Sequence, residues 1–270
     1  MRIGVVGGTG TLGALASAEL ARRGHAVWVL SRREPVEMTA SPHRRVDLSN
    51  WEGLAEAVSD LGVVVDAPNV PRPGRETRAV MVDGAERLLR AEAQADVGLH
   101  VLISIVGIES VPMSYYRMKP EQERRVGEAQ VRSGVLRSTQ FHQLLDGLFR
   151  ATSRFGVLPS GSALVRPVDP REVARVLADA IECGSWDGSL EVAGPEIVSL
   201  TALARAWSAA MGRRRALVPM PFAGRLGRAL RAGALTSEDA VPGELRFADW
   251  LRQGPGVRAP SGAAPEGADL

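Results

Sequence analysis

Short apolar runs alternate with helix-like patterns through about the first 105 residues of the chain. The runs lie at residues 3–6, 26–30, 63–66 and 100–104, and each is expected to form a strand. Helical spacing of apolar residues follows them at residues 12–22, 51–58 and 77–95. The expected strands are continuously apolar, as in Val63-Val64-Val65. This pattern predicts an α/β fold with a parallel sheet covered by helices on both faces.

The alternation of strand-like and helix-like patterns is less regular in the second half of the chain. We expect helices at about 121–132, 170–181 and 200–211, and short strands near 136–139, 163–168 and 190–193. Trp207 and Trp250, with the apolar residues at helical spacing around them, are expected in the core. Residues 155–252 are predicted to form a small α/β lobe interleaved with a core of residues 1–154, in one domain over 1–252. The Gly-, Pro- and Ala-rich residues 253–270 predict a disordered tail.

Composition and charge narrow the classes of function. The 270 residues carry 33 basic and 31 acidic side chains, a net charge of +2, which gives no electrostatic reason to expect nucleic acid or a membrane as partner. No apolar run is long enough to span a bilayer, and no signal peptide is recognisable. Cys183 is the one cysteine, so no intrachain disulfide can form and a cytoplasmic location is expected. No metal-ligand cluster is visible, and the oligomeric state has no signal in the sequence.

The segment GGTGTLG at residues 7–13 places three glycines between the first strand and the first helix. The first glycine permits a sharp turn, the second lets backbone amides approach a pyrophosphate, and the third allows close packing of helix and strand. This spacing predicts a Rossmann-type dinucleotide-binding fold, a doubly wound parallel sheet. The expected contacts with the cofactor come from Gly7, Thr9, Gly10, Thr11, Leu12 and Gly13.

The end of the second strand indicates which dinucleotide is bound. NAD sites usually place a carboxylate there to hold the ribose hydroxyls, but this strand is followed by Ser31, Arg32 and Arg33. A guanidinium can bind the 2′-phosphate of NADP, which a carboxylate would repel. We therefore expect NADP rather than NAD.

Two further segments are expected beside the cofactor. Asp47 and Leu48 precede a helix at the place where such domains contact the adenine. Ala67, Pro68 and Asn69 follow the third apolar run and are expected to line the ribose side.

A candidate catalytic group follows the strand at residues 100–104. Ser104 ends this strand and is expected to face the cofactor. Tyr115 and Lys119 are four residues apart, a spacing that puts both on one helix face, where the ammonium lowers the pKa of the phenol. Lys119 is the single lysine beside 32 arginines, which indicates a position that requires lysine. Lys119 is also expected to hold the nicotinamide ribose.

Pro120 complicates this arrangement. Residues before proline avoid the helical region, so a helix that begins only at Pro120 would put Tyr115 and Lys119 out of register. Tyr116 is then the alternative proton donor, or Lys119 only anchors the cofactor.

Together these segments resemble the NmrA-like, atypical branch of the extended short-chain dehydrogenase/reductase family over about residues 2–250. The resemblance rests on six segments, which lie at 7–13, 31–33, 46–48, 104–119, 138–142 and 193–196. It implies a substrate pocket between the sheet edge and the C-terminal lobe, near Tyr116, Phe141 and His142. Residues 134–137 are a few residues short of the family pattern, which predicts a distorted strand.

Three functions are compatible with these features. The first is an NADP-dependent oxidoreductase that acts on a small organic carbonyl or enone. The second is a redox-sensing regulator that binds NADP and transfers no hydride. The third is an epimerase- or dehydratase-like enzyme that recycles a bound cofactor, as sugar-nucleotide epimerases do. The substrate itself is not specified by the sequence.

Overall fold

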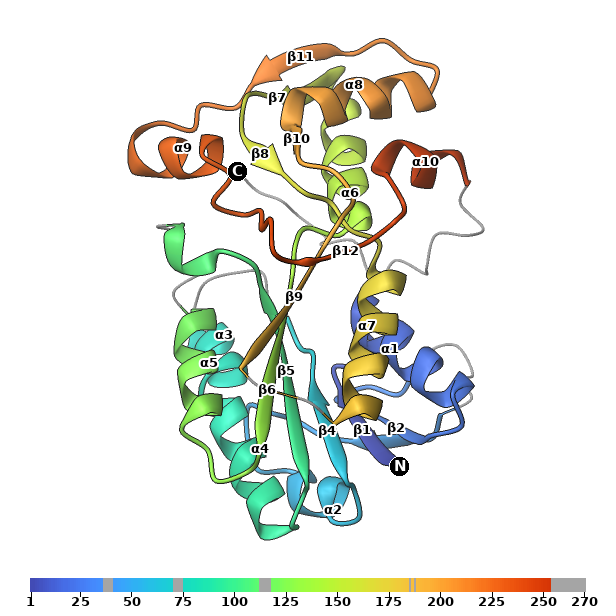
Figure 1. Ribbon diagram of the computed structural model, residues 1–270, viewed down its shortest axis with the longest axis vertical. Coiled ribbons are helices and arrows are strands. Elements are labelled where there is room, and N and C mark those ends of the chain that lie inside the picture. Colours follow the sequence, from blue (N-terminus) through green and yellow to red (C-terminus); the bar gives the residue numbers. More distant parts are fainter. Residues whose placement is uncertain (36–40, 70–74, 112–117, 185, 187, 254–270) are drawn as a thin grey trace.

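The structure, a computed structural model, describes residues 1–35, 41–69, 75–111, 118–184, 186 and 188–253. Its centre is an eight-stranded sheet in which every neighbouring pair of strands is parallel (Figure 1). In spatial order the strands are β12 (Val241–Pro242), β9 (Ser189–Ala193), β6 (Ser133–Ser138), β5 (Leu99–Ile105), β4 (Val63–Asp66), β1 (Arg2–Val6), β2 (Ala26–Ser31) and β3 (His43–Arg45). This confirms the predicted Rossmann-type α/β fold.

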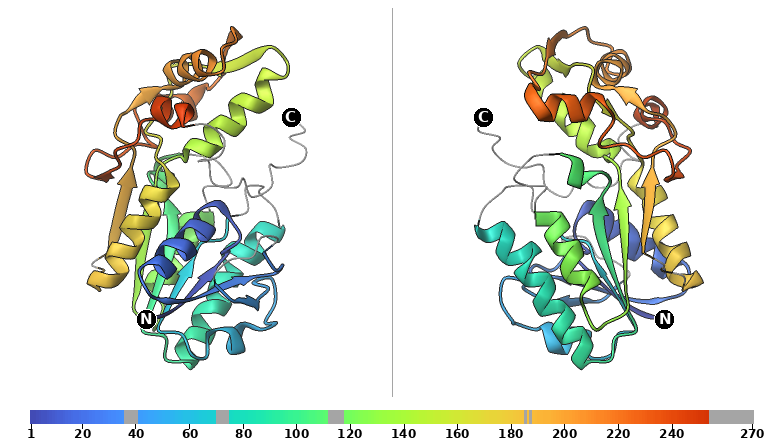
Figure 2. Two further views of the ribbon diagram at one scale, coloured as in Figure 1. Left: turned by 90° about the vertical axis from the view of Figure 1, so that its right-hand side faces the viewer. Right: turned by 60° about the vertical axis from the view of Figure 1, so that its left-hand side comes forward.

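Helices cover both faces of the sheet (Figures 1 and 2). One face is covered by α1 (Thr11–Arg22) and α7 (Pro170–Cys183), and the other by α2 (Leu54–Val58), α4 (Asp83–Gln94) and α5 (Met118–Gly127). Successive residues of a strand point to opposite faces. Val63 and Val65 therefore pack under α1 and α7, whereas Val64 packs under α2 and α4.

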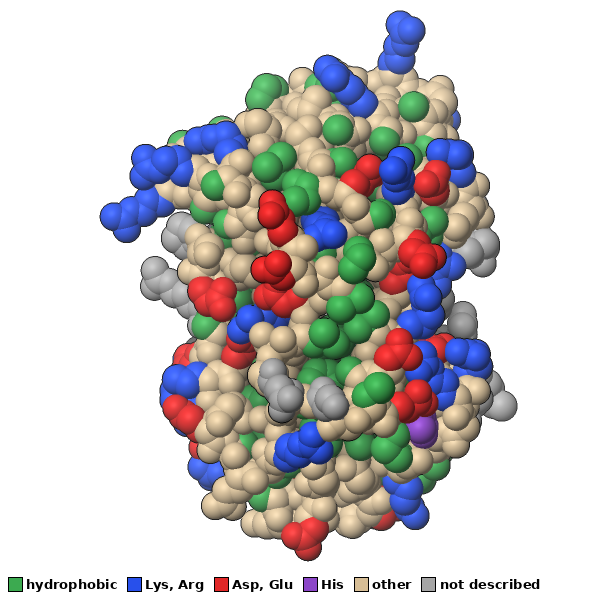
Figure 3. Space-filling model, viewed as in Figure 1, with side chains coloured by type: hydrophobic (Ala, Val, Ile, Leu, Met, Phe, Trp, Pro, Cys, Tyr) green, Lys and Arg blue, Asp and Glu red, His purple; other side chains and the backbone are tan. Residues whose placement is uncertain are grey.

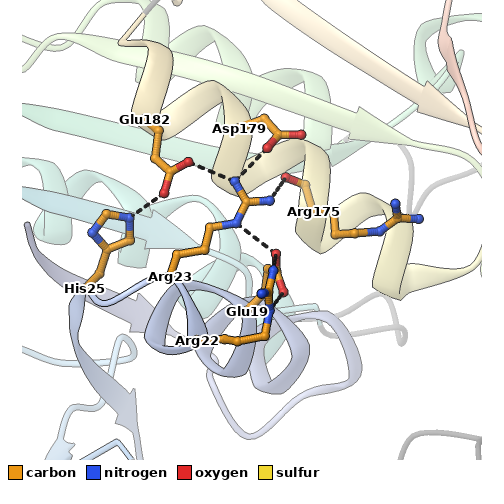
Figure 4. A network of polar contacts seen from close by, with 7 residues as sticks. All are labelled: Glu19, Arg22, Arg23, His25, Arg175, Asp179 and Glu182. Atoms are coloured by element: carbon orange, nitrogen blue, oxygen red, sulfur yellow. Dashed lines mark hydrogen bonds and ion pairs between the residues drawn. The ribbon is translucent and has the colours of Figure 1, made fainter.

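Ion pairs also connect the end of helix α1 to helix α7 (Figure 4). The Arg23 guanidinium, just after α1, contacts Glu19 on its own helix and Asp179 and Glu182 on α7, at 2.6–2.8 Å. Glu182 in turn contacts the His25 ring at 3.0 Å. This network fixes the helix that follows the glycine turn against the helix that returns from the lobe.

The second lobe lies beyond the carboxyl ends of the strands (Figures 1 and 2). Its helices are α6 (His142–Ser153), α8 (Leu200–Ala210), α9 (Gly224–Arg231) and α10 (Phe247–Arg252). Its strand pairs are β7 (Val157–Ser160) with β11 (Ala216–Pro219) and β8 (Leu164–Val165) with β10 (Val198–Ser199). Phe149, Trp207, Phe247 and Trp250 form its core, so the prediction that both tryptophans are core residues is confirmed.

Several element boundaries differ from the predictions. The expected helix over 77–95 is two helices, α3 (Arg75–Met81) and α4, which meet at Val82. The expected helix at 121–132 begins earlier, at Met118. Pro120 therefore lies in the first turn of α5, where its missing N–H is not needed. Strand β6 pairs regularly with β5 from Ser133 to Ser138, so the expected distortion there was wrong.

The elements that escaped prediction include the short strands β3, β7, β10, β11 and β12 and the helices α6, α9 and α10. Strand β3 has three residues, too few to show a pattern. Helix α6 contains Gly147, which lowers helix propensity in its middle. Helices α9 and α10 are eight and six residues long, and their helical conformation depends on the lobe against which they pack.

Candidate functional site

The site lies at the carboxyl edge of the sheet, where the order of the strands reverses. The chain passes from β1 to β2 on one side, and β4 pairs with β1 on the other. The amide of Gly7 donates to the oxygen of Leu30 at 2.9 Å, and the amide of Ala67 donates to the oxygen of Val6 at 3.1 Å. The loops after β1, β2 and β4 therefore meet at one point, which is where doubly wound sheets bind ligands.

The fold requires glycine to different degrees at the three positions of the turn. Gly7 has φ +70°, and a Cβ there would lie 2.9 Å from the nitrogen of Pro68. A Cβ on Gly13 would lie 2.3 Å from the oxygen of Gly7, so glycine is needed for helix and turn to pack. A Cβ on Gly10 would contact only the oxygen of Gly7, at 3.2 Å. Gly10 is therefore the glycine that the fold itself needs least.

Helix α1 presents an uncompensated positive end at this turn. It begins at Thr11 with no side-chain cap from Gly10 and no acidic residue in its first turn. The free amides and the helix dipole at such an end favour an anion. Thr9 is exposed and Thr11 half-buried, whereas the Leu12 side chain is in the core, so Leu12 can offer only its backbone amide.

The residues after β2 leave their charges exposed. The Ser31 hydroxyl donates to the oxygen of Arg33 at 2.6 Å and lies 3.1 Å from the His43 ring, so it is engaged in the turn. Arg32 and Arg33 are exposed, and within the described residues no carboxylate lies within ion-pair distance of either. This corner offers two guanidinium groups to an anionic ligand.

The segment after β3 brings Asp47 near this corner. Its Oδ1 accepts hydrogen bonds from the amide and the hydroxyl of Ser49, at 2.9 and 2.8 Å. Burial by itself would raise the pKa of Asp47, but the bonds from Ser49 and the charges of Arg32 and Arg45 outweigh it and lower that pKa. Asp47 is therefore anionic at neutral pH.

The other residues expected beside the cofactor differ in exposure. The Leu48 side chain is buried in the core. Ala67 and Pro68 are half-buried against the glycine turn, and Asn69 is exposed.

The structure brings Lys119 and Ser104 together. The Lys119 ammonium is buried and donates from Nζ to the backbone oxygen of Ile103 at 2.9 Å. Ser104, the next residue on β5, is 1% exposed, and its Oγ has no hydrogen-bond partner among the described residues. Tyr115 and Tyr116 lie outside the described residues. The two predicted groups that are described are therefore both buried next to Ile103, near the carboxyl end of β5.

Burial changes the acidity of Lys119. Loss of solvation lowers its pKa from 10.5 to about 8, against the opposing charges of Asp66 and Glu123. A lysine with a pKa near 8 can hold or release a proton close to neutral pH.

Two residues near Lys119 escaped prediction. Asp66 ends β4, is buried, and accepts a hydrogen bond of 3.0 Å from the Gln122 amide on α5. Burial raises the pKa of Asp66, although His100, Lys119 and Gln122 partly oppose this. The signal in the sequence was a carboxylate at the end of a wholly apolar run, Val63-Val64-Val65.

A second buried pair lies deeper on the same face of the sheet. His100 Nδ1 lies 2.9 Å from a carboxylate oxygen of Glu92 on α4, and neither side chain is exposed. Burial disfavours the imidazolium, but Glu92 outweighs it and raises the pKa of His100. These contacts put a group of buried titratable side chains between the sheet and helices α4 and α5.

Phe141 and His142, which were expected near a substrate pocket, lie in different surroundings. Phe141 is partly buried against the core beneath α1 and α7. His142 has no exposed surface, lies beside Phe247 and Trp250, and its Nε2 contacts the oxygen of Leu245 at 3.0 Å. Burial lowers its pKa to about 4. His142 therefore packs as a neutral residue among the aromatic rings of the lobe.

Other kinds of site receive little support from the described part of the chain. A cavity of about 380 Å³ lies between the start of α7 and residues 244–245, and none of the predicted site residues lines it. The described side chains contain no group of three or more His, Cys, Asp or Glu that could hold a metal ion. Nor does any helix in the described ranges have the length and apolar character needed to cross a membrane.

A glycine turn at the switch point of a doubly wound parallel sheet defines the Rossmann class of dinucleotide-binding folds. Comparison with solved structures agrees with this class. Triphenylmethane reductase from Citrobacter matches with a TM-score of 0.79 and 17% identity, over 94% of this chain and 99% of that one. An NADPH-dependent quinone oxidoreductase from Escherichia coli matches with a TM-score of 0.76 and 15% identity, over 93% and 98%.

A nucleoside-diphosphate-sugar epimerase from Staphylococcus aureus also matches, with a TM-score of 0.76 and 17% identity, over 93% of this chain and all of that one. No family model and no curated protein sequence matches the chain. The chain thus has the fold shared by extended short-chain dehydrogenases/reductases and sugar-nucleotide epimerases, as its resemblance to the NmrA-like branch implied.

Proposed function

We propose that the chain binds NADP at the carboxyl edge of the sheet. The glycine turn and the free end of α1 would hold the pyrophosphate, because this helix end has no acidic residue to compete with a phosphate. Ala67, Pro68 and Asn69 would line the ribose side, and Asp47 with the backbone of Leu48 would lie beside the adenine. Among the solved structures that share the fold, one is described as NADPH-dependent and an epimerase from Thermus thermophilus is in complex with NAD.

The preference for NADP over NAD rests on Arg32 and Arg33. Both side chains are exposed at the end of β2, and no described carboxylate neutralises either by an ion pair. A 2′-phosphate accepts charge-assisted hydrogen bonds from a guanidinium, whereas the ribose hydroxyls of NAD gain less from it. Ser31 would support the turn through its bond to the oxygen of Arg33.

The reaction we propose is reduction of a small organic carbonyl or enone. The observation that carries this proposal is the position of Lys119, buried against the end of β5 beside Ser104 with a pKa of about 8. NADPH supplies a hydride when bound. Ser104 and Tyr115, or Tyr116, would donate hydrogen bonds to the substrate oxygen, and Lys119 would lower the pKa of the phenol and hold the ribose.

The test has two stages. Calorimetric titration of the full chain with NADP and NAD first measures which cofactor binds. NADPH oxidation is then followed with carbonyl compounds, enones, quinones and triphenylmethane dyes, because the last two classes are named for proteins of the same fold. Failure to bind either cofactor would refute the proposal. NADP binding without oxidation by any compound would favour the sensor.

A second candidate, an NADP-binding sensor without turnover, is favoured by one contact. The Lys119 ammonium is already bonded to the oxygen of Ile103, so its role can be purely structural. The epimerase-like alternative also remains, because sugar-nucleotide epimerases share the fold. Its distinguishing result would be cofactor that stays bound through purification and is not consumed.

A further inference from the structure

The positive charge of the chain is concentrated in one stretch of the lobe. Every charged side chain from residue 197 to residue 237 is an arginine, and there are seven: Arg205, Arg213, Arg214, Arg215, Arg225, Arg228 and Arg231. Of the 33 basic and 31 acidic residues in the whole chain, this leaves 26 basic and 31 acidic residues elsewhere. We expected no membrane partner from the net charge of +2. That net charge is the sum of a basic segment at residues 197–237 and an acidic remainder of the chain.

These arginines differ in their partners from many other arginines of the chain, although not from Arg32 and Arg33. Elsewhere, arginines such as Arg23 and Arg137 each contact three carboxylates within 4.0 Å. Within the described residues, none of the seven has a carboxylate at ion-pair distance, and neither does Arg154. Charges that no internal partner neutralises are available to an external anion.

Two hydrogen bonds to backbone oxygens bring part of this region together. The Arg215 guanidinium donates from Nε to the oxygen of Ser153 at 3.2 Å, and the amide of Ala216 donates to the oxygen of Gly156 at 3.1 Å. The end of α6 and the start of β11 therefore lie side by side. We call this surface the lobe tip, formed by Arg154, Phe155, Arg213, Arg214 and Arg215.

The lobe tip carries an exposed aromatic ring among its arginines. Phe155 is 81% exposed, more than any other large apolar side chain described. Strand β11 and the residue that follows it add two exposed apolar side chains, Val218 at 46% and Met220 at 40%. Figure 3 shows Lys and Arg side chains projecting from the top of this lobe, with hydrophobic side chains among them.

We propose that the lobe tip binds the surface of a membrane that contains anionic lipids. The guanidinium groups would contact lipid phosphates, and Phe155 would insert at the boundary between headgroups and acyl chains. Single-stranded nucleic acid fits this surface less well, because successive bases need several aromatic platforms and the lobe tip has one ring. The neighbouring exposed side chains, Val218 and Met220, are apolar but not aromatic, and they gain from contact with acyl chains rather than from stacking.

The lobe tip is well placed for such attachment. Strands β7 and β11 and helix α8 form the end of the lobe farthest from the eight-stranded sheet (Figures 1 and 2). The glycine turn lies at the other side of the lobe, at the carboxyl edge of that sheet. Binding through the lobe tip would therefore leave the proposed cofactor site open to solution.

The test is sedimentation of the full chain with vesicles of phosphatidylcholine alone and of an equal mixture with phosphatidylglycerol. We expect binding to the mixed vesicles only, and loss of that binding in high salt. The triple variant R154A/R213A/R214A should weaken binding on the order of 100-fold, at about fivefold for each arginine. Phe155→Ala should weaken it about tenfold at every salt concentration, because its contribution is apolar.

The matched control is R45A/R90A/R124A, which removes the same charge from exposed arginines of the N-terminal half. It should bind mixed vesicles like the wild-type chain. Arg215 is kept in all variants because it bonds to Ser153, and unchanged circular dichroism would show that each variant folds. Equal losses in the triple variant and the control would overturn the proposal. So would binding to a single-stranded oligonucleotide without binding to vesicles.

Discussion

Lys119 donates a hydrogen bond of 2.9 Å from Nζ to the backbone oxygen of Ile103, the residue immediately before Ser104. The single lysine of the chain is thereby held, buried, against the strand end that carries the candidate catalytic serine. An ammonium in such a position loses the stabilisation that water gives its charge. Its neighbours Asp66 and Glu123 compensate for only part of that loss. The contact has measurable consequences for stability and for chemistry.

The first prediction concerns stability and pH. The pKa of Lys119 falls from 10.5 to about 8 on folding, so between these values the unfolded chain holds a proton that the folded chain has released. The free energy of unfolding should therefore rise with pH through this window, by about 3 kcal/mol relative to Lys119→Met. Denaturant titrations of both proteins at several pH values measure this difference. Parallel curves from pH 8 to 10.5 would show that the lysine keeps its ordinary pKa.

The second prediction separates two glycines of the turn. Gly10→Val should abolish NADP binding and leave the fold intact, because a Cβ there meets only the oxygen of Gly7, at 3.2 Å, and the side chain would occupy the pyrophosphate position. Gly13→Val should instead destabilise the fold, because its Cβ would lie 2.3 Å from the same oxygen. Calorimetric titration and thermal unfolding distinguish the two effects. If the Gly10 variant binds NADP with the affinity of the wild-type chain, the motif is only a structural turn and does not bind the pyrophosphate.

The third prediction concerns cofactor preference. Arg32→Ala should lose about 1–3 kcal/mol of NADP binding, the value of a charge-assisted hydrogen bond, and should leave NAD binding nearly unchanged. Arg90→Ala, which removes an exposed arginine from α4, serves as the control for net charge. Titrations with both cofactors test the prediction. If both affinities fall equally, Arg32 does not bind the 2′-phosphate.

The fourth prediction concerns the network between α1 and α7 (Figure 4). Arg23→Gln should lower the free energy of unfolding by about 1–3 kcal/mol at neutral pH, because Arg23 joins Glu19 to Asp179 and Glu182. The hydrogen bond from Arg22 is the main cause that lowers the pKa of Glu19 from 4.5 to about 2. Burial opposes this change, and the hydrogen bond from Arg23 adds to it. The stabilisation from this carboxylate is therefore complete above pH 4.5 and is lost as the pH falls through about 2.

Arg22→Gln is the matched control for this network. Arg22 also contacts Glu19 but is 69% exposed, and among the described residues it forms no ion pair with α7. Chemical denaturation at neutral pH should show a larger loss for the Arg23 variant than for the control, and the losses should shrink as the pH falls toward 2. Equal losses would mean that the bridge between the helices adds nothing.

The fold was predictable where a signal is local. The apolar runs at 3–6, 26–30 and 63–66 correspond to β1, β2 and β4, because continuous apolar residues can only be buried on both faces. The lobe was less predictable. Helices α9 and α10 form only where the lobe packs against them, and that packing is invisible in eight or six residues.

The candidate site shows the same division. The glycine turn is one local segment, and the observed φ of Gly7 and the close approach at Gly13 are those its spacing predicts. The bond between Asp66 and Gln122 joins residues 56 apart in sequence, so no local pattern could predict it. Burial of His142 likewise depends on Phe247 and Trp250 from the end of the chain. The surroundings of His142 could therefore not be predicted from its own segment.

The last prediction concerns catalysis and separates the proposed functions. Lys119→Arg keeps the positive charge, but a planar guanidinium does not fit the buried position against Ile103 that a compact ammonium occupies. Turnover should therefore fall far more than the retained charge suggests. Tyr115→Phe should lower turnover by about 100- to 10,000-fold with NADP affinity little changed, as expected when a general acid is lost. Because either tyrosine can be the donor, Tyr116→Phe is measured beside it. A sensor would show no turnover in any of these proteins, and Lys119→Arg would change only NADP affinity. If a substrate is found and both phenylalanine variants retain full activity, the proton comes from another group and the assignment of Tyr115 or Tyr116 is wrong.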